Sequence, residues 1–345
     1  MLNALLLSFA AMMVGQAPAT ARAEYEPPKA IVRTAPAQEI TLRDAARDRD
    51  VLLTVRRPRA DDNDHDVGET GGPAPLVIFS HGAGGSGEAF EHLSTALALR
   101  GYVVVHPWHS DSIKLAQRRG ERGHDPKRGL DQLVDRVDLR DRLADVQFIL
   151  ESIDELEKAL EAPGLIDRQR IGMAGHSAGA MTTQTAAGLM FYPRARGRGR
   201  SMPVEEIDAF AVISGQGTTR RSITERSWET CTRPMLVVAG SRDETSLTDE
   251  TPASRRHPFE HAPADGTKYL LFIDGATHSS YQGRDASRRL REETPLNVDW
   301  IERITTAAVV AHMDAYVRDD KAAKTWLDSG AIKAIEGGRL EWRHK

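Results

Sequence analysis

The sequence predicts an α/β fold, with a mostly parallel central sheet covered by helices on both faces. Short, continuous apolar runs recur along the chain, which is typical of parallel strands buried on both faces. Segments with apolar residues three to four positions apart alternate with these runs and predict amphipathic helices. One apolar run leads directly into a glycine-flanked serine and then into a helical segment. Strands and helices that alternate in this way form a parallel sheet with helices on both faces.

Each apolar run is bounded by turn residues, which defines the expected strands. They cover residues 40–42, 51–55, 76–80, 102–106, 171–174, 209–213 and 235–239, and then 268–273 as the last. The charged run at 43–50 is expected to be the turn between the first two strands. Helices are expected at 91–100, 178–190, 294–317 and 322–328, and the apolar spacing over 130–156 predicts one long amphipathic helix. No internal repeat or linker divides the chain, so residues 40–345 are expected to form a single domain.

The overall composition is that of a soluble globular protein. Of the 345 residues, 28% are charged and 40% are hydrophobic, and the net charge is −4. This charge gives no reason to expect nucleic acid or an anionic membrane as a partner, and the arginine-rich stretch 194–200 is interpreted as a solvated loop. Cys231 is the only cysteine, so the chain cannot form an internal disulfide.

The N-terminal residues are typical of an export signal. An apolar stretch at 4–14 is followed by small residues that end in Ala21-Arg22-Ala23, which fits the small-x-small pattern of cleavage sites. Residues 1–23 are therefore expected to be a signal peptide cleaved after Ala23, and the protein to be periplasmic or secreted. Residues 24–39 are expected to be a flexible lead-in. The apolar stretch is too short to span a bilayer, so stable membrane insertion is not expected.

The segment Gly175-His176-Ser177-Ala178-Gly179 fits the nucleophile elbow, Gly-x-Ser-x-Gly. In such an elbow a sharp strand-to-helix turn exposes the serine hydroxyl, and the flanking glycines allow close backbone approach. The expected strand before Ser177 and the expected helix after it supply the context that the motif requires. Ser177 is therefore the candidate nucleophile, whereas His176 is expected to shape the backbone.

A serine nucleophile needs a histidine base and a carboxylate that orients it. In an open parallel sheet these residues follow the carboxyl ends of strands. Asp243 follows the expected strand at 235–239, and His278 follows the last expected strand. The chain order Ser, Asp, His agrees with this arrangement. Asp243 is the leading candidate for the acid, with Glu244 and Asp249 as alternatives.

The oxyanion formed by attack on a carbonyl needs fixed N–H donors. One donor is expected from the backbone of Ala178, directly after the nucleophile. The second is expected from Ala83, in the glycine-rich loop 81–85 that follows the strand at 76–80. This loop lacks the Lys and Ser/Thr of a nucleotide-binding loop, so no cofactor is predicted. The acidic stretch near 62–66 lacks the glycine and glutamate of a calcium loop, so no metal is predicted either.

Together, Ser80-His81-Gly82-Ala83-Gly84-Gly85, the elbow, Gly240-x-x-Asp243 and Gly275-Ala276-Thr277-His278 resemble the α/β-hydrolase superfamily. Within it, the chain resembles the dienelactone hydrolase-like branch, which includes secreted bacterial esterases, platelet-activating-factor acetylhydrolase-like enzymes and polyester hydrolases. The resemblance covers about residues 40 to 330 and implies an α/β-hydrolase fold. It also implies a triad of Ser177, Asp243 and His278 with an oxyanion hole at Ala83 and Ala178.

Two departures from this branch bear on the substrate. True dienelactone hydrolases use a cysteine nucleophile where this chain has Ser177, and many polyester hydrolases carry paired cysteines near the C-terminus that are missing here. Trp108, Trp228 and Tyr281 follow expected strand ends and are candidates to line an acyl pocket. No long insertion separates the strands at 209–213 and 235–239, so no large cap is expected, and an open cleft would admit bulky or extended esters.

The predicted function is hydrolysis of carboxylic esters, of small molecules or extended substrates, through an acyl-enzyme. Two alternatives stay open: an amide or peptide hydrolase with the same triad, and a non-catalytic binding protein on a hydrolase scaffold. The natural substrate and the oligomeric state do not follow from the sequence.

Overall fold

The computed structural model describes residues 25–29, 36–58, 72–121, 135–192, 197–220, 222–246, 248–289 and 293–345. Several predictions therefore lie wholly or partly outside the described residues. They concern the signal peptide, most of the lead-in, the acidic stretch, the first part of the long helix and much of the arginine-rich stretch. None of the helices in the described part of the chain is both long and apolar enough to cross a membrane.

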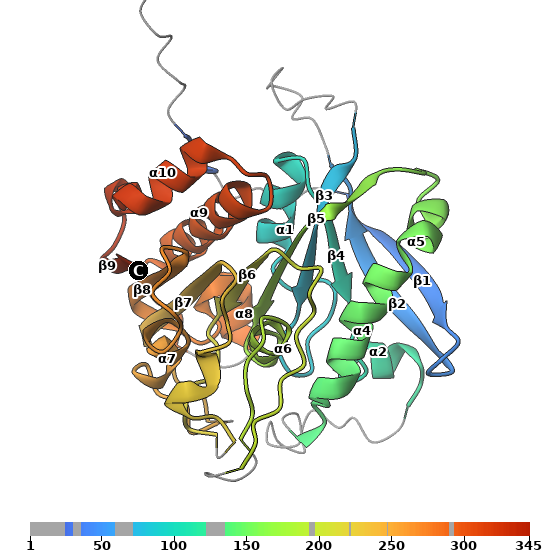
Figure 1. The fold of residues 1–345 in the computed structure, drawn as a ribbon, viewed down its shortest axis with the longest axis horizontal. Helices are drawn as coiled ribbons and strands as arrows, with labels where there is room; N and C mark the ends of the chain where they lie inside the picture. The colour runs from blue at the N-terminus through green and yellow to red at the C-terminus, as the bar shows by residue number, and fades with distance from the viewer. Residues whose placement is uncertain are drawn as a thin grey trace, which may run out of the picture.

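A nine-stranded sheet runs through the centre of the described residues (Figure 1). Its strands are β1 (Gln38–Asp44), β2 (Arg49–Arg56), β3 (Ala74–Ser80), β4 (Val103–Pro107), β5 (Ile166–His176), β6 (Ala209–Ile213), β7 (Met235–Arg242), β8 (Lys268–Thr277) and β9 (Leu340–His344). They lie in the order β1-β2-β4-β3-β5-β6-β7-β8-β9. Neighbouring strands are parallel from β4 through β3, β5, β6 and β7 to β8. The pairs β1–β2, β2–β4 and β8–β9, at the two sides of the sheet, are antiparallel. The predicted mostly parallel α/β sheet is confirmed.

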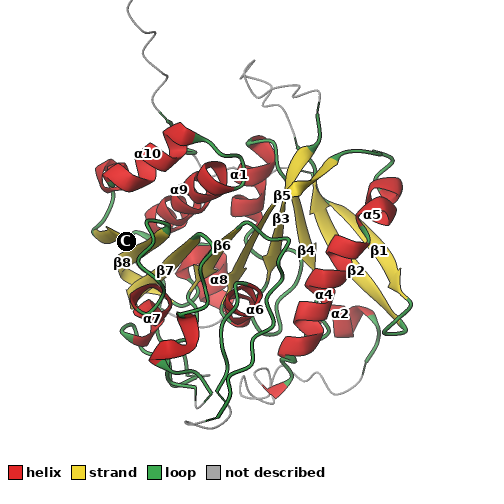
Figure 2. Cartoon of the chain, viewed as in Figure 1, coloured by secondary structure: helices red, strands yellow, loops and turns green. Residues whose placement is uncertain are grey.

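Helices cover both faces of this sheet (Figure 2). They are α1 (Glu91–Leu99), α2 (Ile113–Arg118), α4 (Leu139–Glu151), α5 (Ile153–Ala159), α6 (Ala178–Ala186), α7 (His257–Glu260), α8 (Arg284–Arg289), α9 (Val298–Tyr316) and α10 (Lys321–Ser329). Residues of α1, α9 and α10 belong to the hydrophobic cluster on one face, and residues of α4, α5 and α6 to the cluster on the other. Parallel strands need this double cover because both of their faces are apolar.

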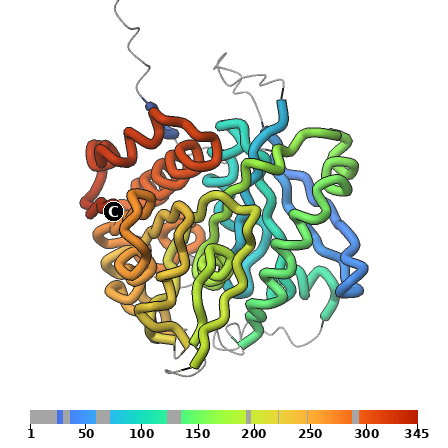
Figure 3. Tube along the Cα trace, viewed as in Figure 1, coloured from blue at the N-terminus to red at the C-terminus, as the bar shows by residue number. Residues whose placement is uncertain are grey.

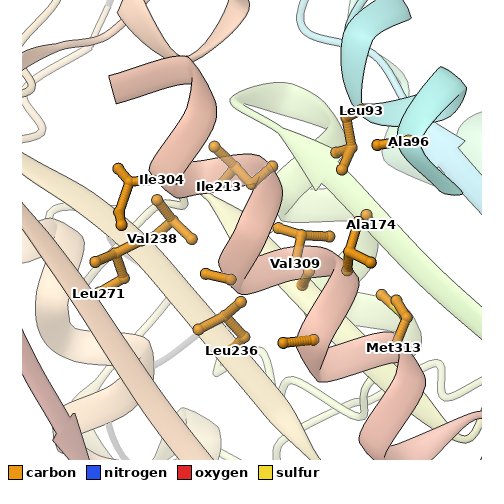
Figure 4. Packing of buried hydrophobic residues seen from close by; sticks show 14 of the residues in the cluster. Leu93, Ala96, Ala174, Ile213, Leu236, Val238, Leu271, Ile304, Val309 and Met313 are labelled. Atoms are coloured by element: carbon orange, nitrogen blue, oxygen red, sulfur yellow. The ribbon is translucent and has the colours of Figure 1, made fainter. Parts of the chain in front are cut away.

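Helix α9 packs its apolar residues across parallel strands of the sheet (Figure 4). Val309 and Ile304 of α9 lie in one cluster with Ile213, Val238 and Leu271 of the sheet, and all five are fully buried. Each such side chain stabilises the fold by roughly 1.5–3 kcal/mol. This packing holds β6, β7 and β8 side by side, so that the residues after each strand meet at one edge.

Two expected elements differ in the structure. The strand at 268–273 is not the last, because β9 pairs antiparallel with β8 and buries Trp342, whose Nε1–H donates to the Leu327 carbonyl oxygen at 2.9 Å. The expected single helix over 130–156 is wrong, since α4 starts after an Asp138 cap and stops before Ser152, where α5 begins. The Asp138 carboxylate accepts the backbone N–H groups of the first helical turn, which starts a helix there whatever the apolar spacing before it.

The lead-in expected over 24–39 contains an anchored residue, Tyr25. Its side chain is 8% exposed, and its hydroxyl donates to Asp314 Oδ2 at 2.7 Å. The Arg100 guanidinium lies 5.1 Å from the ring centre. The short segment that carries Tyr25 lies beside α10 (Figure 3). Flexibility is therefore the wrong expectation for Tyr25.

Candidate active site

The elbow after β5 adopts the strained turn that its sequence predicts. Ser177 has φ 56° and ψ −115°, a conformation that costs a non-glycine residue about 1–3 kcal/mol. A Cβ on Gly175 would lie 2.3 Å from the Gly179 carbonyl oxygen, and a Cβ on Gly179 would lie 1.9 Å from the Ser80 carbonyl oxygen. Both positions therefore require glycine, because β5, α6 and the end of β3 approach one another too closely for any side chain.

The structure brings Ser177, His278 and Asp243 together at the carboxyl edge of the sheet. His278 Nε2 lies 2.9 Å from Ser177 Oγ, and His278 Nδ1 lies 3.1 Å from Asp243 Oδ1. Asp243 is fully buried, whereas the alternatives Glu244 and Asp249 are exposed. The three side chains form a continuous chain of polar contacts of the kind that transfers a serine proton to an imidazole.

Asp243 has three further partners that the sequence analysis did not identify as such. Ser214 Oγ donates to Asp243 Oδ1 at 2.7 Å and lies 2.7 Å from His278 Nδ1. Tyr281 Oη donates to Asp243 Oδ2 at 2.8 Å, and Arg255 Nε lies 3.1 Å from Asp243 Oδ1. Burial alone would raise the pKa of Asp243, but the Arg255 charge and the bonds from His278 and Ser214 hold that pKa well below its usual value. The carboxylate is therefore ionised at neutral pH.

A positional signal existed for one of these residues but not for another. Ser214 directly follows β6, and the rule that site residues follow parallel strands could have found it. Arg255 comes from the short 3-10 helix Ser254–Arg256, and nothing in the sequence around it separates a buried arginine from an exposed one.

His176 acts on the backbone, as expected. Its Nε2 lies 2.8 Å from the carbonyl oxygen of His278, so the elbow and the loop after β8 are held together. Burial, and then the nearby His278, lower the pKa of His176 to about 3. The ring is therefore neutral in the range in which most enzymes work.

The two expected oxyanion donors lie beside the nucleophile. Ala83, Ala178 and Ser177 line the same cavity, of about 60 Å³. Within the part of the chain that the structure describes, the backbone N–H groups of Ala83 and Ala178 donate to no protein acceptor. Ala178 is also the first residue of α6, where N–H groups have no partner within the helix. Both N–H groups are available to a ligand oxygen.

Trp108, Trp228 and Tyr281 do not line this cavity, contrary to expectation. All three side chains are fully buried. Trp108 Nε1 donates to Thr54 Oγ1 and Trp228 Nε1 donates to Gln184 Oε1, each at 2.8 Å, so both indoles are satisfied inside the protein. Tyr281 instead contacts Asp243. The cavity is lined by Ala83, Val137, Leu139, Ser177, Ala178, Met181, Gln216, Arg220, Thr245, Thr248 and Arg255.

A wider hollow of about 270 Å³ lies beside the loop after β7 and is lined by Ser241, Arg242, Glu244, Thr277 and Glu293. None of Ser177, Asp243 and His278 lines this hollow. The exposed side chains of Arg242 and Glu293, which do line it, form an ion pair with each other. We therefore place the reacting groups at the smaller cavity, where Ser177 is accessible.

One cluster has the residue types of a metal site: His257, Glu260 and His261, whose ligand atoms lie within 4.8 Å of one another. His257 Nδ1 accepts the backbone N–H of Thr218 at 3.2 Å, and Glu260 pairs with Arg256 at 3.2 Å. Two of the three groups therefore already have protein partners.

The comparisons with known proteins agree with this fold and with an esterase. A family model described as "Platelet-activating factor acetylhydrolase, isoform II" matches residues 51–117, which include the loop 81–85. "Putative esterase YitV" of Bacillus subtilis (strain 168) is 35% identical over 110 residues, which cover 32% of this chain and 37% of that protein. The match thus spans little more than a third of the relative's length.

A solved structure is similar over most of this chain. It is the crystal structure of a "Putative Dienelactone Hydrolase" from Klebsiella pneumoniae subsp. pneumoniae MGH 78578, with a TM-score of 0.51 and 19% identity. The similarity covers 79% of this chain and 98% of that one. The chain therefore has the fold of an α/β-hydrolase. In sequence and fold it is similar to dienelactone hydrolase-like and platelet-activating-factor acetylhydrolase-like esterases.

Proposed function

We propose that this protein is a serine hydrolase that cleaves carboxylic esters through an acyl-enzyme intermediate. The observation that carries the proposal is the continuous chain from Ser177 Oγ through His278 to Asp243, with contacts of 2.9 and 3.1 Å. Available N–H donors at Ala83 and Ala178 line the same cavity. A nucleophile, a base, an orienting acid and oxyanion donors are the groups that acyl transfer requires.

In the proposed reaction, Ser177 Oγ attacks the ester carbonyl carbon while His278 Nε2 takes the hydroxyl proton. The negative charge that develops on the carbonyl oxygen is stabilised by the N–H groups of Ala83 and Ala178. Collapse of the tetrahedral intermediate expels the alcohol, which receives the proton from His278. Water then attacks the acyl-serine carbonyl while His278 takes the water proton. Collapse of this second intermediate releases the carboxylic acid, and His278 returns the proton to Ser177 Oγ, with Asp243 orienting the imidazole throughout.

An amide hydrolase and a non-catalytic binding protein, the two alternatives, predict results that differ from those of an esterase. An amide hydrolase with these groups would cleave a matched anilide at a rate comparable to that of the ester. A binding protein would leave Ser177 unlabelled by a fluorophosphonate probe. The ionised, buried Asp243 supports catalysis, since a site that only binds has no use for a carboxylate held beside an imidazole.

We also propose that the protein is exported, from the leader-like pattern at residues 1–23. The amino-terminal sequence of protein recovered outside the cytoplasm is expected to start at Glu24. Recovery of the full-length chain in the cytoplasm alone would contradict export.

The small cavity predicts a preference for short acyl groups. With para-nitrophenyl esters, kcat/KM for acetate and butyrate is expected to exceed that for octanoate by about tenfold, because the cavity beside Ser177 is small, about 60 Å³. Met181→Ala, which shortens a lining side chain, is expected to shift the preference toward longer chains. Met202→Ala serves as the control, since Met202 is exposed and lines no part of the cavity. Equal rates for all chain lengths would contradict the acyl-site assignment.

Activity is expected to fall on acidification below neutral pH, because the base must be unprotonated to accept the Ser177 proton. Asp243 does not cause this loss: its pKa lies well below its usual value, so it stays ionised in mild acid. His176 stays neutral there because its pKa is about 3. The profile of kcat/KM is therefore expected to show a single-proton acid limb. A kcat/KM that does not fall on acidification would contradict a histidine base.

A further inference from the structure

The peptide group between Gly82 and Ala83 is fixed from its carbonyl side. The Gly82 carbonyl oxygen accepts the Gly85 N–H at 3.0 Å, His81 Nδ1–H at 2.7 Å and Arg142 Nη2–H at 3.2 Å. The described residues contain no cis peptide bond, and in a trans peptide the C=O and N–H point in opposite directions. Three donors on the carbonyl therefore direct the Ala83 N–H away from them, and Ala83 lines the cavity together with Ser177.

A buried ion pair between Arg142 and Asp111 binds the backbone of the loop 81–85. Arg142, on α4, is 0% exposed, and its Nε and Nη2 donate to the two carboxylate oxygens of Asp111 at 3.0 and 2.7 Å. Its Nη1 donates to the His81 carbonyl oxygen at 2.6 Å. Asp111 Oδ2 also accepts the Gly84 N–H at 3.0 Å. The pair thus holds the loop at His81, Gly82 and Gly84.

The contacts of His81 leave only one protonation state for its ring. Its Nε2 accepts the backbone N–H of His109 at 3.1 Å, so the hydrogen resides on Nδ1 and is donated to the Gly82 carbonyl oxygen. Burial, and then the positive charge of Arg142, hold the pKa of His81 well below its usual value. His81 is therefore a fixed neutral donor rather than a second base.

We propose that Arg142, paired with Asp111, is a positioning residue that aims and polarises the Ala83 N–H of the oxyanion hole. The guanidinium charge on the Gly82 carbonyl strengthens the N–H at the other end of the same peptide, because hydrogen bonds polarise one another in a chain. The loop is close enough to matter: a Cβ on Gly82 would lie 3.5 Å from Ser177 Cβ. This inference rests on the proposed esterase function.

The test compares Arg142→Met and Arg142→Lys with wild type on the best para-nitrophenyl ester. Removal of one oxyanion donor lowers kcat by about 10²–10³-fold, and a donor that is loosened rather than removed should lose part of this, roughly 10- to 100-fold in kcat. KM is expected to stay within about twofold, because the charge develops only in the transition state. Arg142→Lys keeps the positive charge but not the forked set of guanidinium donors, so its kcat should lie between those of Arg142→Met and wild type.

A structural role alone would not change the affinity for a tetrahedral adduct. Butylboronic acid forms such an adduct with a serine nucleophile and places an oxygen in the oxyanion hole. Its inhibition constant is expected to rise in proportion to the loss of kcat across the two variants. Arg100→Met, which removes the partner of another buried carboxylate, Asp314, is the matched control and is expected to keep both constants. Folding of every variant is checked by circular dichroism.

The outcomes separate the inference from the function on which it rests. If wild type hydrolyses no ester, the proposed function fails. If wild type is active and folded Arg142→Lys or Arg142→Met keeps wild-type kcat and boronate affinity, the inference alone is overturned. If kcat falls while boronate affinity is unchanged, Arg142 acts on another step, which also overturns it.

Discussion

Ser177→Ala abolishes ester hydrolysis: kcat/KM is expected to fall by about 10⁴- to 10⁶-fold relative to wild type. The variant loses the hydroxyl oxygen that lies 2.9 Å from His278 Nε2, whereas the oxyanion donors at Ala83 and Ala178 remain. The residual rate then reports what binding and those donors contribute without a nucleophile. The measurement is hydrolysis of a short-chain para-nitrophenyl ester with purified wild type and variant.

Ser329→Ala is the control for this prediction, because it removes a serine hydroxyl at the end of α10, outside the catalytic groups. Its kcat/KM should equal that of wild type. Ser177→Ala should keep the wild-type circular dichroism spectrum, because alanine has the same Cβ and meets the same backbone strain at φ 56°. A folded Ser177→Ala variant with more than a hundredth of wild-type activity would disprove Ser177 as the nucleophile.

Arg255→Met is expected to cause a large loss of stability. Arg255 is 1% exposed, pairs with Asp243, and donates to the carbonyl oxygens of Ser214 and Gly215 at 3.0 Å each. Removal of one partner of a buried ion pair costs about 3–5 kcal/mol, because the other charge stays buried without compensation. Urea unfolding at pH 7 measures this loss, and kcat should fall as the support of His278 is weakened.

The Arg255 variant also has a defined pH dependence. In wild type the pKa of Asp243 is depressed, so its contribution to stability is complete above the pKa of the unfolded chain, about 4, and is lost only as the pH falls through the lower folded value. Without Arg255 the folded pKa rises toward the unfolded value, so the contribution of Asp243 is smaller at neutral pH and less of it remains to be lost in acid. The difference in unfolding free energy between wild type and Arg255→Met should therefore be greatest at pH 7 and should narrow as the pH falls.

The adjacent Arg256 provides a matched control. Its guanidinium pairs with Glu260 and Glu341 near the surface, and Arg256→Met should change the free energy of unfolding by about 1 kcal/mol or less. If Arg255→Met were no more destabilising than Arg256→Met, the Arg255–Asp243 pair would not be the support that its geometry indicates.

The sequence was sufficient where a local pattern and the strand order determine the outcome. Ser177 is recognisable because five neighbouring residues define its turn. Asp243 and His278 are recognisable because parallel strands place their following residues at one edge. The approach of these three side chains was therefore predictable, even though more than a hundred positions separate Ser177 from His278 in the chain.

Contacts between distant segments were not predictable in this way. Arg142 contacts the loop at His81 from a helix 61 positions further along, and nothing in the amphipathic spacing of α4 indicates that one of its arginines is fully buried. The indole of Trp108 was expected in a pocket because it follows a strand, but its partner Thr54 lies on a separate strand. In both cases the side chain's environment is determined by tertiary packing.

Two residues of the site, Ser177 and Ser214, have positive φ angles of 56° and 53°, although neither is glycine. Each conformation costs about 1–3 kcal/mol, so the catalytic edge lowers the resistance of the whole protein to heat. Substitutions elsewhere that raise the melting temperature would leave this cost in place, whereas glycine at either position would remove it together with a hydroxyl that the site uses. Thermal tolerance and reactivity are thus opposed at these two serines, and a more heat-resistant variant should be sought in the helices and surface loops.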